Sequence, residues 1–492
     1  MIQVTLVGHE FQYEIEHLLR AFFPQARFNF STVTSADQDM QVISMWKDDR
    51  FYAKVEVEDQ TYVKEHKEHI TITKEMDRRK IAKRLLKKVL YEALVAYTKK
   101  PLPWGILTGI RPTKIVQEAL EEGRSEKDIT KELLEMFHIQ QDKIDLMLAV
   151  AKAEKQILDK NKVGEISIYI GIPFCPTRCV YCSFTSYPIL QWKDQVDKYI
   201  DALIKEIKAF HDFYEQTPIR SVYIGGGTPT SLDETQLQRL LDAVNMYIPM
   251  ESVEEWTIEA GRPDTITLEK LQMMKEAGVG RISINPQTMQ NKTLEVIGRQ
   301  HTVDDIIQAF YMAKEVGFHC INMDLIVGLP GENIDDVKET WNQLSLLKPD
   351  NITIHTMAIK RASYLHRNQE KYHMMDTNEV EEILAFIEEQ AKFMGLEPYY
   401  LYRQKNMVGN FENVGYALLG KECIYNVEIM EEKQTILAFG AGAATKIVDL
   451  STNAIQRIEN VKDVQHYIER TEEMIQRKNS VKNRIFQVNR KN

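Results

Sequence analysis

From Glu165 onward, short β-rich runs of apolar residues alternate with longer stretches in which apolar residues recur at helical spacing. This alternation is typical of repeated βα units around a parallel sheet. The β-rich runs cover residues 166–173, 220–227, 255–261, 281–287, 320–330 and 351–359. Helical patterns between them include residues 197–214, 231–248 and 267–278. Six such units predict an open, partial (β/α)6 barrel, with its chemistry at the carboxyl ends of the strands.

The flanking regions follow other patterns, and a chain of 492 residues is expected to form two or three compact units. Strand-like runs and a long helical pattern from about Met76 to Tyr97 predict an N-terminal α/β domain over residues 1–160, followed by the barrel over residues 161–365. Residues 366–492 predict a C-terminal α+β substrate or cover domain, with a helix near 378–394, strands at 397–402 and 434–439, and a charged helical tail. The predicted fold class is α/β.

Composition and charge indicate which broad classes of protein are compatible with the sequence. The chain has 43% hydrophobic and 27% charged residues and a formal net charge of -10, which is typical of a globular protein and argues against a nucleic-acid partner. No apolar run approaches the roughly 18 residues of a membrane span, and the start lacks a basic region followed by an apolar one. We therefore expect a cytoplasmic protein with no membrane partner, and a monomer.

Three of the five cysteines lie within eight residues, in the segment GIPFCPTRCVYCSF directly after the first predicted strand. Cys175, Cys179 and Cys182 are too few for structural zinc, which uses four closed ligands. Three thiolates on a 4Fe-4S cluster leave one iron free to bind another molecule. The spacing favours iron–sulfur, with zinc or unmetallated thiols as the alternatives.

The Cys-x3-Cys-x2-Cys motif, with the aromatic Tyr181 before the third cysteine, resembles the signature of the radical S-adenosylmethionine (SAM) superfamily. The resemblance implies that Cys175, Cys179 and Cys182 bind a 4Fe-4S cluster. It also implies that the open iron chelates SAM, and that an electron from the reduced cluster cleaves SAM to a 5′-deoxyadenosyl radical.

Polar and glycine-rich segments at later strand ends suit such a ligand. The run Gly225-Gly226-Gly227-Thr228-Pro229-Thr230 follows the second strand and allows close approach of the backbone, although an ordinary turn is the alternative. Carboxylate and amide groups can accept hydrogen bonds from ribose hydroxyls, and a guanidinium can hold a carboxylate. Such groups occur at Glu259, Gln287, Asp324 and Arg299.

The segments TIEAGRPDTI, RISINPQTM, EVIGRQHT, MDLIVGLPGE and FGAGAATK resemble, more narrowly, the oxygen-independent coproporphyrinogen III oxidase branch. The N-terminal part, with PWGILTGIRPTK, resembles HemZ-type members, the coproporphyrinogen dehydrogenases. In this branch the positions that bind SAM correspond to Tyr169, Tyr181, Gly226, Gly227, Thr228, Glu259, Gln287, Arg299, Asp324 and Ala358.

The resemblance implies an oxidoreductase of haem biosynthesis that converts coproporphyrinogen III to protoporphyrinogen IX. It would use a small porphyrinogen substrate and an electron donor such as a flavodoxin or ferredoxin. One departure is Phe184, where the oxidases carry a fourth cysteine. We weigh two alternatives: a haem-trafficking protein of the HemW type, or radical chemistry on another substrate.

The haem-trafficking relatives use a His-Asn-x-x-Tyr-Trp segment, and here the nearest match begins with Glu412 and ends with Ala417. His355 could replace the missing imidazole, although a lone histidine near a strand end is more often structural. We therefore rank the enzyme first.

One further pattern is a basic face on the N-terminal helix, formed by Lys80, Lys83, Arg84, Lys87 and Lys88. It is either a docking surface for an acidic electron donor or, as we favour, a solvated helix face. Cys320 lies in an apolar strand and is expected to be a buried, inert thiol.

Overall fold

A computed structural model describes residues 1–31, 40–70, 75–214, 217–360, 362–404, 411–452 and 454–480. The chain forms two compact units. One consists of Met1–Ala151 with Arg403–Phe411, and the other of Lys152–Tyr402 with the chain from Glu412 onward. The segment expected as a separate C-terminal domain therefore shares a unit with the barrel, apart from Arg403–Phe411.

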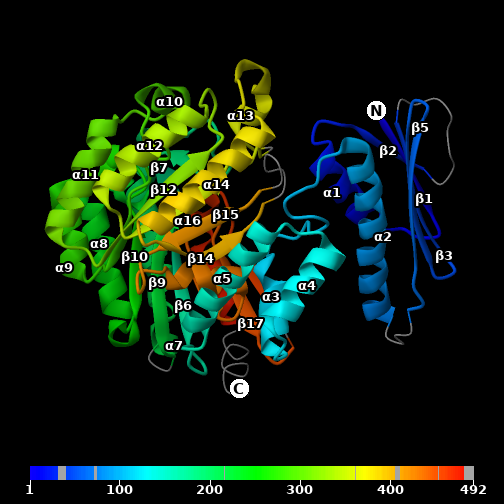
Figure 1. Ribbon diagram of the computed structural model, residues 1–492. Coiled ribbons are helices and arrows are strands. Elements are labelled where there is room, and N and C mark those ends of the chain that lie inside the picture. The colour runs from blue at the N-terminus through cyan, green and yellow to red at the C-terminus, as the bar shows by residue number, and fades with distance from the viewer. Residues whose placement is uncertain are drawn as a thin grey trace. The chain divides into compact units, whose positions relative to one another are not determined.

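The first unit is built on a five-stranded sheet of order β2-β1-β3-β4-β5 (Figure 1). Its strands are β1 (Ile2–Val7), β2 (Phe28–Ser31), β3 (Met40–Lys47), β4 (Arg50–Val57) and β5 (Gln60–Lys67). Burial alternates along β3 and β4 because one face of the sheet packs against α2 (Glu75–Thr98). The other helices in this part of the chain are α1 (Gln12–Phe22), α3 (Thr113–Glu121), α4 (Glu126–Phe137) and α5 (Gln141–Leu158).

The basic face of α2 has partners within this unit. Lys83 pairs with Glu14, Arg84 pairs with Glu132 at 3.1 Å, and Lys87 donates to the carbonyl of Ile106 at 2.9 Å. Burial lowers the pKa of Lys87 to about 8. These pairs reduce the free positive charge on the face, and a role in docking an electron donor stays a prediction.

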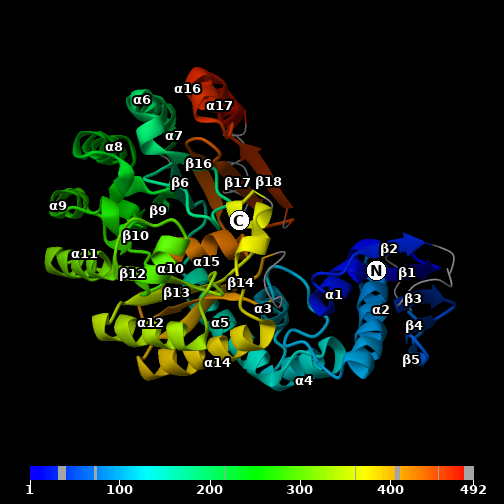
Figure 2. The same ribbon diagram turned by 90° about the horizontal axis from the view of Figure 1, so that it is seen from above.

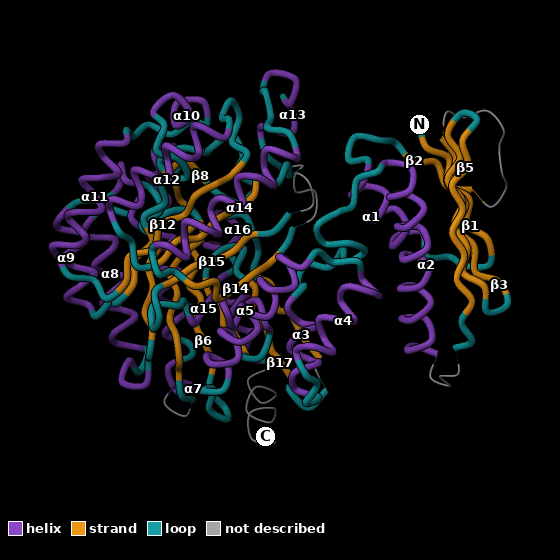
Figure 3. Tube along the Cα trace, in the orientation of Figure 1, coloured by secondary structure: helices purple, strands orange, loops and turns teal. Residues whose placement is uncertain are grey.

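The second unit contains six parallel strands that pair in chain order. They are β6 (Ile166–Ile172), β9 (Ile219–Gly226), β10 (Glu255–Glu259), β11 (Arg281–Ser283), β12 (Cys320–Val327) and β13 (Asn351–Thr356). Figure 2 shows the helices as an arc outside these strands, and Figure 3 shows the same layering by element type. The larger helices are α6 (Lys193–Lys208), α8 (Glu234–Tyr247), α9 (Leu268–Ala277), α11 (Val303–Val316), α12 (Ile334–Leu347) and α14 (Thr377–Phe393). The predicted open barrel is confirmed.

Buried and partly exposed side chains alternate along the barrel strands, so that core residues lie on one face and candidate functional residues on the other. On β6, Ile168 and Ile170 are fully buried beneath the helices, whereas Tyr169 between them is only partly buried. On β12 the partly exposed Asp324 lies between the buried Met323 and Leu325. Successive side chains of a strand point to opposite faces, so the apolar face supplies the core and the opposite face faces the barrel interior.

The C-terminal part extends the same sheet at both edges, and in the described residues the sheet has eleven strands in the order β14-β15-β13-β12-β11-β10-β9-β6-β16-β17-β18. The added strands are β14 (Glu397–Tyr402), β15 (Asn413–Ala417), β16 (Thr435–Phe439), β17 (Ala444–Asp449) and β18 (Ala454–Glu459). β15 pairs with β13 in antiparallel fashion, and β16 is parallel to β6. Because these strands pair with strands of the barrel, the C-terminal residues that contain them belong to the same compact unit as the barrel.

A buried carboxylate fixes the end of the described chain to the barrel. Glu206 on α6 is fully buried and accepts hydrogen bonds from Asn460, from Tyr467 and from the backbone of Gly440, and it pairs with Lys478. Tyr467 lies on α16 (Val464–Glu469) and Lys478 on α17 (Thr471–Asn479). Breaking a buried pair of this kind leaves an uncompensated charge, so Glu206 holds these segments against α6.

The remaining short elements are β7 (Phe174–Cys175), β8 (Tyr187–Pro188), α7 (His211–Tyr214), α10 (Asn291–Val296), α13 (Tyr364–Arg367) and α15 (Ile424–Glu431). Among the described helices, none combines the length and apolar character that crossing a membrane requires.

Candidate functional site

The three clustered cysteines lie on the loop that follows β6. Cys175 belongs to β7, which pairs with β8 and so fixes the two ends of the loop to each other. The backbone N–H of Cys182 donates to the carbonyl of Cys179 at 3.1 Å, which forms a turn around Tyr181. All three thiols are unpaired by disulfides and only partly buried. The loop therefore presents them at the carboxyl end of the barrel strands, where we expected them.

The surroundings of the thiols suit metal ligands. Burial raises the pKa of the Cys175 thiol to about 11 and also raises that of Cys182. A bound metal cation would lower both values, because the thiolate is the form that ligates a metal. Within the described ranges, no three His, Cys, Asp or Glu side chains converge on one point as ligands of a single ion would. Thiolates that bind three different irons of a cubane need not converge.

The glycine run after β9 packs directly against the cysteine loop. The backbone N–H of Gly227 donates to the carbonyl of Ile172, and that of Thr228 to the carbonyl of Phe174, both at 2.7 Å. A Cβ atom at Gly227 would lie 2.5 Å from the carbonyl oxygen of Phe174 and 3.0 Å from the sulfur of Cys175. The hydroxyl of Thr228 lies 3.5 Å from the same sulfur. Glycine is required here because two backbone segments meet without room for a side chain.

Glu259 at the end of β10 has two partners on the neighbouring strand β9. Its Oε1 accepts from the hydroxyl of Tyr223 at 2.6 Å, and its Oε2 accepts from the backbone N–H of Gly226 at 3.2 Å. Burial raises the pKa of Glu259 to about 7, with nearby Asp324 acting in the same direction. The ring of Tyr169 stacks on that of Tyr223 at 6.3 Å between centroids. Four of the predicted SAM residues therefore lie on or directly after three adjoining strands: Tyr169, Gly226, Gly227 and Glu259.

Gln287 and Asp324 form a second pair of neighbours. Gln287 follows β11 and has φ +69°, a conformation that side-chain-bearing residues rarely adopt. Its backbone N–H donates to the carbonyl of Asp324 at 2.9 Å, and its buried Oε1 has no hydrogen-bond partner. Asp324 accepts from the amide of Asn322 at 2.7 Å. Strain and an unpartnered amide oxygen at one residue are features of a binding position.

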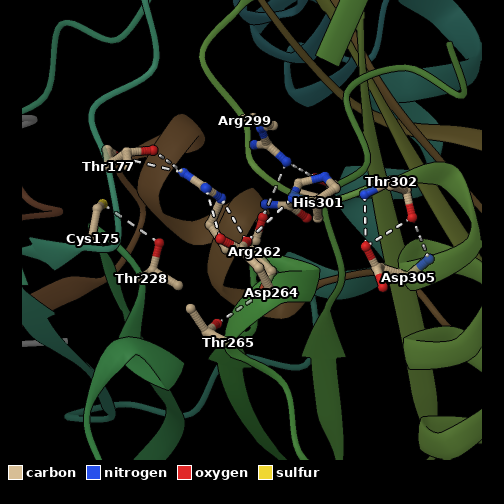
Figure 4. A network of polar contacts seen from close by, with 12 residues as sticks. Cys175, Thr177, Thr228, Arg262, Asp264, Thr265, Arg299, His301, Thr302 and Asp305 are labelled. Carbon is tan, nitrogen blue, oxygen red and sulfur yellow. Dashed lines mark hydrogen bonds and ion pairs between the residues drawn. The ribbon is translucent and has the colours of Figure 1, made fainter. Parts of the chain in front are cut away.

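Arg299 follows α10 and connects the cysteine loop to the strand ends. Its Nη2 donates to the hydroxyl of Tyr181 at 3.3 Å, while its Nη1 donates to the carbonyl of Asn285 (Figure 4 shows Arg299 beside His301). Burial by itself would lower the pKa of Arg299, but Tyr181 and Cys179 raise it, so the guanidinium stays charged. Its Nε is buried and unpartnered. Both Nη atoms thus bind the protein, and Nε is a buried donor without a partner that a ligand can use.

Ala358, the last predicted SAM residue, lies just after β13 and is partly buried. Because β13 pairs with β12, the strand that carries Asp324, Ala358 follows a strand next to that of Asp324. His355 on β13 lies between two groups: its Nδ1 is 3.2 Å from the Tyr402 hydroxyl and its Nε2 is 3.6 Å from Asp324.

Sequence reasoning missed two residues of this region. Tyr223 binds Glu259, and its inward-facing position two residues before the glycine run was a usable signal. Arg262, two residues before Asp264, is almost fully buried and reaches Thr177 and Cys179 on the cysteine loop. Arg262 lies within the segment TIEAGRPDTI, whose resemblance to the oxidase branch was the available signal.

The residues present fit the two cofactors that the signature implies. Three thiols without disulfide partners can bind three irons and leave the fourth open. On the segments that follow β11, the unpartnered Gln287 Oε1 can accept from a hydroxyl or amino group, and the unpartnered Arg299 Nε can donate to a carboxylate. Both kinds of group occur in SAM.

Comparisons with known proteins identify the family of this chain. Residues 169–344 match the family described as the radical SAM superfamily. The chain is 40% identical over 413 residues to the oxygen-independent coproporphyrinogen-III oxidase-like protein HemZ of Bacillus subtilis, covering 83% of this chain and 82% of HemZ. It is also 32% identical to the haem chaperone HemW of the same organism, over 62% of this chain and 75% of HemW.

Among solved structures, the coproporphyrinogen III oxidase HemN of Escherichia coli, described as a radical SAM enzyme, matches with a TM-score of 0.52 and 22% identity. The match covers 66% of this chain and 73% of HemN, and it shows a shared fold. Taken with the extent of the HemZ match, these likenesses establish a 4Fe-4S cluster and SAM as the cofactors and show that the chain belongs to the radical SAM superfamily, in its HemN- and HemZ-like branch.

Proposed function

We propose that this chain is a radical SAM oxidative decarboxylase that converts coproporphyrinogen III to protoporphyrinogen IX in haem biosynthesis. The observation that carries the proposal is the contact of Arg299 with Tyr181 on the cysteine loop, together with the unpartnered polar atoms of Arg299 and Gln287. The extent of the likeness to HemZ supports the choice of substrate. The proposal includes an electron donor such as a flavodoxin or ferredoxin.

The cluster and SAM, when bound, supply a 5′-deoxyadenosyl radical as the hydrogen-abstracting species. The chain's own residues would position these groups. Cys175, Cys179 and Cys182 would hold three irons, while Glu259 and Asp324 would accept hydrogen bonds from ribose hydroxyls. The Nε of Arg299 would hold the methionine carboxylate, and the ring of Tyr181, tied to Arg299, would keep the loop closed over it.

The substrate would lose one hydrogen atom from a propionate side chain, then CO2 and one electron to an external acceptor, leaving a vinyl group. Two such turns, with two SAM molecules, give the product. A stack of tyrosines on the interior face suits a large pyrrolic substrate. Tyr223 stacks on Tyr425 at 4.4 Å between centroids, and Tyr169 stacks on both. Aromatic rings of this kind pack against pyrroles and limit the access of water to a reactive radical.

Haem trafficking is the second candidate function, favoured by the likeness to HemW. The segment that matches the haem-binding motif of such proteins offers little support for it. Glu412 replaces the histidine and is 2% exposed, and Asn413 binds the backbone of Thr356 at 2.7 Å through its side chain. Tyr416 is buried in β15. The contacts of this segment are typical of a strand in the interior of a sheet. We therefore rank the decarboxylase function above haem trafficking.

His355 is a weak substitute as a haem ligand. An axial ligand needs an accessible ring nitrogen, and both nitrogens of His355 already face Tyr402 and Asp324. Binding iron would require the ring to leave this arrangement.

Phe184 is the departure from the oxidase pattern that bears most directly on the proposed decarboxylase activity. It is 70% exposed, two residues after Cys182, at the position of the fourth cysteine of the oxidases. Its side chain therefore supplies neither a ligand nor core packing. A Phe184→Cys variant tests whether the missing thiol limits the reaction.

The deciding experiment uses the full chain with its cluster reconstituted under anaerobic conditions. It is incubated with SAM, dithionite and coproporphyrinogen III, and porphyrins and 5′-deoxyadenosine are measured by chromatography. We expect vinyl-bearing products in step with 5′-deoxyadenosine, and neither with Cys179→Ala. Stoichiometric haem binding without any decarboxylated porphyrin, in both wild type and Phe184→Cys, would reverse the ranking.

A further inference from the structure

Arg262 lies immediately beyond β10, and its side chain is 4% exposed. Nε and Nη2 donate to the two oxygens of Asp264 at 2.9 Å each. Nη1 donates to the hydroxyl of Thr177 at 3.1 Å and points at the sulfur of Cys179 at 3.9 Å. Figure 4 shows the guanidinium between Thr177 and Asp264. One side chain therefore joins the end of a barrel strand to the cysteine loop.

The partners of Arg262 are themselves fixed. Asp264 also pairs with Nδ1 of His301 at 3.2 Å, and the Thr177 hydroxyl donates to the carbonyl of Gly298 at 3.1 Å. Burial would raise the pKa of Asp264, but His301 and Arg262 hold it well below its usual range, so the carboxylate is ionised. A bidentate pair with an ionised carboxylate sets the plane and direction of the guanidinium. Its third nitrogen is thereby aimed at Cys179.

We infer that Arg262 is a positioning residue of the cysteine loop that also raises the reduction potential of the cluster through Cys179. Reduction adds one negative charge to the cluster, and a cation with an N–H directed at a ligand sulfur stabilises the more negative state. Cys175 differs in this respect, because the hydrogen-bond donor to its sulfur is the neutral hydroxyl of Thr228. The inference rests on the proposal that Cys179 is a cluster ligand.

The test is a redox titration of the reconstituted full chain, followed by the electron paramagnetic resonance signal of the reduced cluster, without SAM and without porphyrinogen. We expect Arg262→Gln to lower the equilibrium constant for reduction about 10-fold, which is about 59 mV for a one-electron couple. Arg262→Lys keeps the charge and should restore most of the potential. It should bind the loop less firmly, because an ammonium cannot hold Asp264 bidentately.

Asp264→Asn separates an electrostatic role from a structural one. Asparagine keeps one oxygen that accepts from Arg262 and removes the charge that partly neutralises it, so the potential should rise above that of the wild type. If Arg262 only held the loop in place, Asp264→Asn and Arg262→Gln would shift the potential in the same direction. Arg239, paired with Asp197 and Asp201 on the outer helices, provides the matched control, and Arg239→Gln should leave the potential unchanged.

Wild-type potential in an Arg262→Gln protein that retains its iron would overturn the inference, as would a lowered potential in Asp264→Asn. Retention of the full cluster by Cys179→Ala would overturn the ligand assignment and the inference with it. None of these measurements involves a porphyrin, so their failure is distinguishable from a failure of the proposed decarboxylation.

Discussion

The hydroxyl of Tyr223 donates a hydrogen bond to Glu259 over 2.6 Å, and the two side chains come from the neighbouring strands β9 and β10. The same carboxylate accepts from the backbone of Gly226 in the glycine run. Glu259 thus links the glycine run to the barrel interior, and burial raises its pKa to about 7.

This pKa predicts a pH dependence of SAM binding. Above pH 7 Glu259 is ionised and accepts hydrogen bonds from a ribose more strongly than its protonated form does. Affinity for SAM should therefore fall as the pH decreases through about 7. Isothermal titration calorimetry on both sides of this pH, with wild type and Glu259→Gln, checks the prediction. The variant should bind SAM more weakly at high pH and lose this pH dependence, and an unchanged profile would contradict it.

The cluster should depend on each cysteine of the loop and on no other. We expect about four irons and four sulfides per chain in reconstituted wild type, and loss of the cluster in Cys175→Ala, Cys179→Ala and Cys182→Ala. Cys320→Ala and Cys423→Ala are the controls, because both thiols are buried away from the loop, beside Arg281 and Glu255. Iron and sulfide analysis measures the result, and bound zinc without sulfide after anaerobic purification would refute the assignment.

Arg299→Ala and Asp324→Ala should weaken SAM binding and cleavage while leaving the iron content intact. The loss of a charge-assisted hydrogen bond costs about 1.5 to 3 kcal/mol, roughly 10-fold to 100-fold in affinity. Arg299→Lys should rescue little, because an ammonium cannot bind Tyr181 and Asn285 and still offer a donor in the place of Nε. Wild-type SAM affinity in both alanine variants would show that the cradle is misassigned.

Gly227→Ala should disturb the cluster and SAM binding together. The added Cβ would lie 2.5 Å from the carbonyl oxygen of Phe174 and 3.0 Å from the sulfur of Cys175, so the cysteine loop must move. Gly280→Ala is the control, since a Cβ there would meet its nearest neighbour, His319, at an ordinary 3.9 Å. Iron content and SAM affinity of the two variants check this prediction, which fails if both retain wild-type values.

The order of the barrel elements and the placement of the cysteine segment after the first barrel strand could be predicted from the sequence alone. Alternation such as that of Ile168, Tyr169 and Ile170 is local, and it fixes which face of a strand is apolar before any partner is present. The spacing of Cys175, Cys179 and Cys182 is equally local. These features require only neighbouring residues, so a single sequence reveals them.

Only the tertiary structure decided how the C-terminal strands are used. Thr435 pairs with Ile166, and Ile352 pairs with Tyr416, although long stretches of chain separate the members of each pair. The residues of β15 show no strand pattern of their own in the sequence. Whether a short run joins a sheet edge depends on which edge is free, and this is a property of the assembled barrel.

The contacts within the candidate site were likewise decided by the tertiary structure. The sequence contained Arg299 and Arg262 but could not show that both Nη atoms of Arg299 bind the protein or that Arg262 reaches Cys179. These contacts join loops that follow different strands, and their distances are set by how the strands pack. The residue types that chemistry needs are therefore local in the sequence, whereas the direction in which each donor points is determined by the tertiary fold.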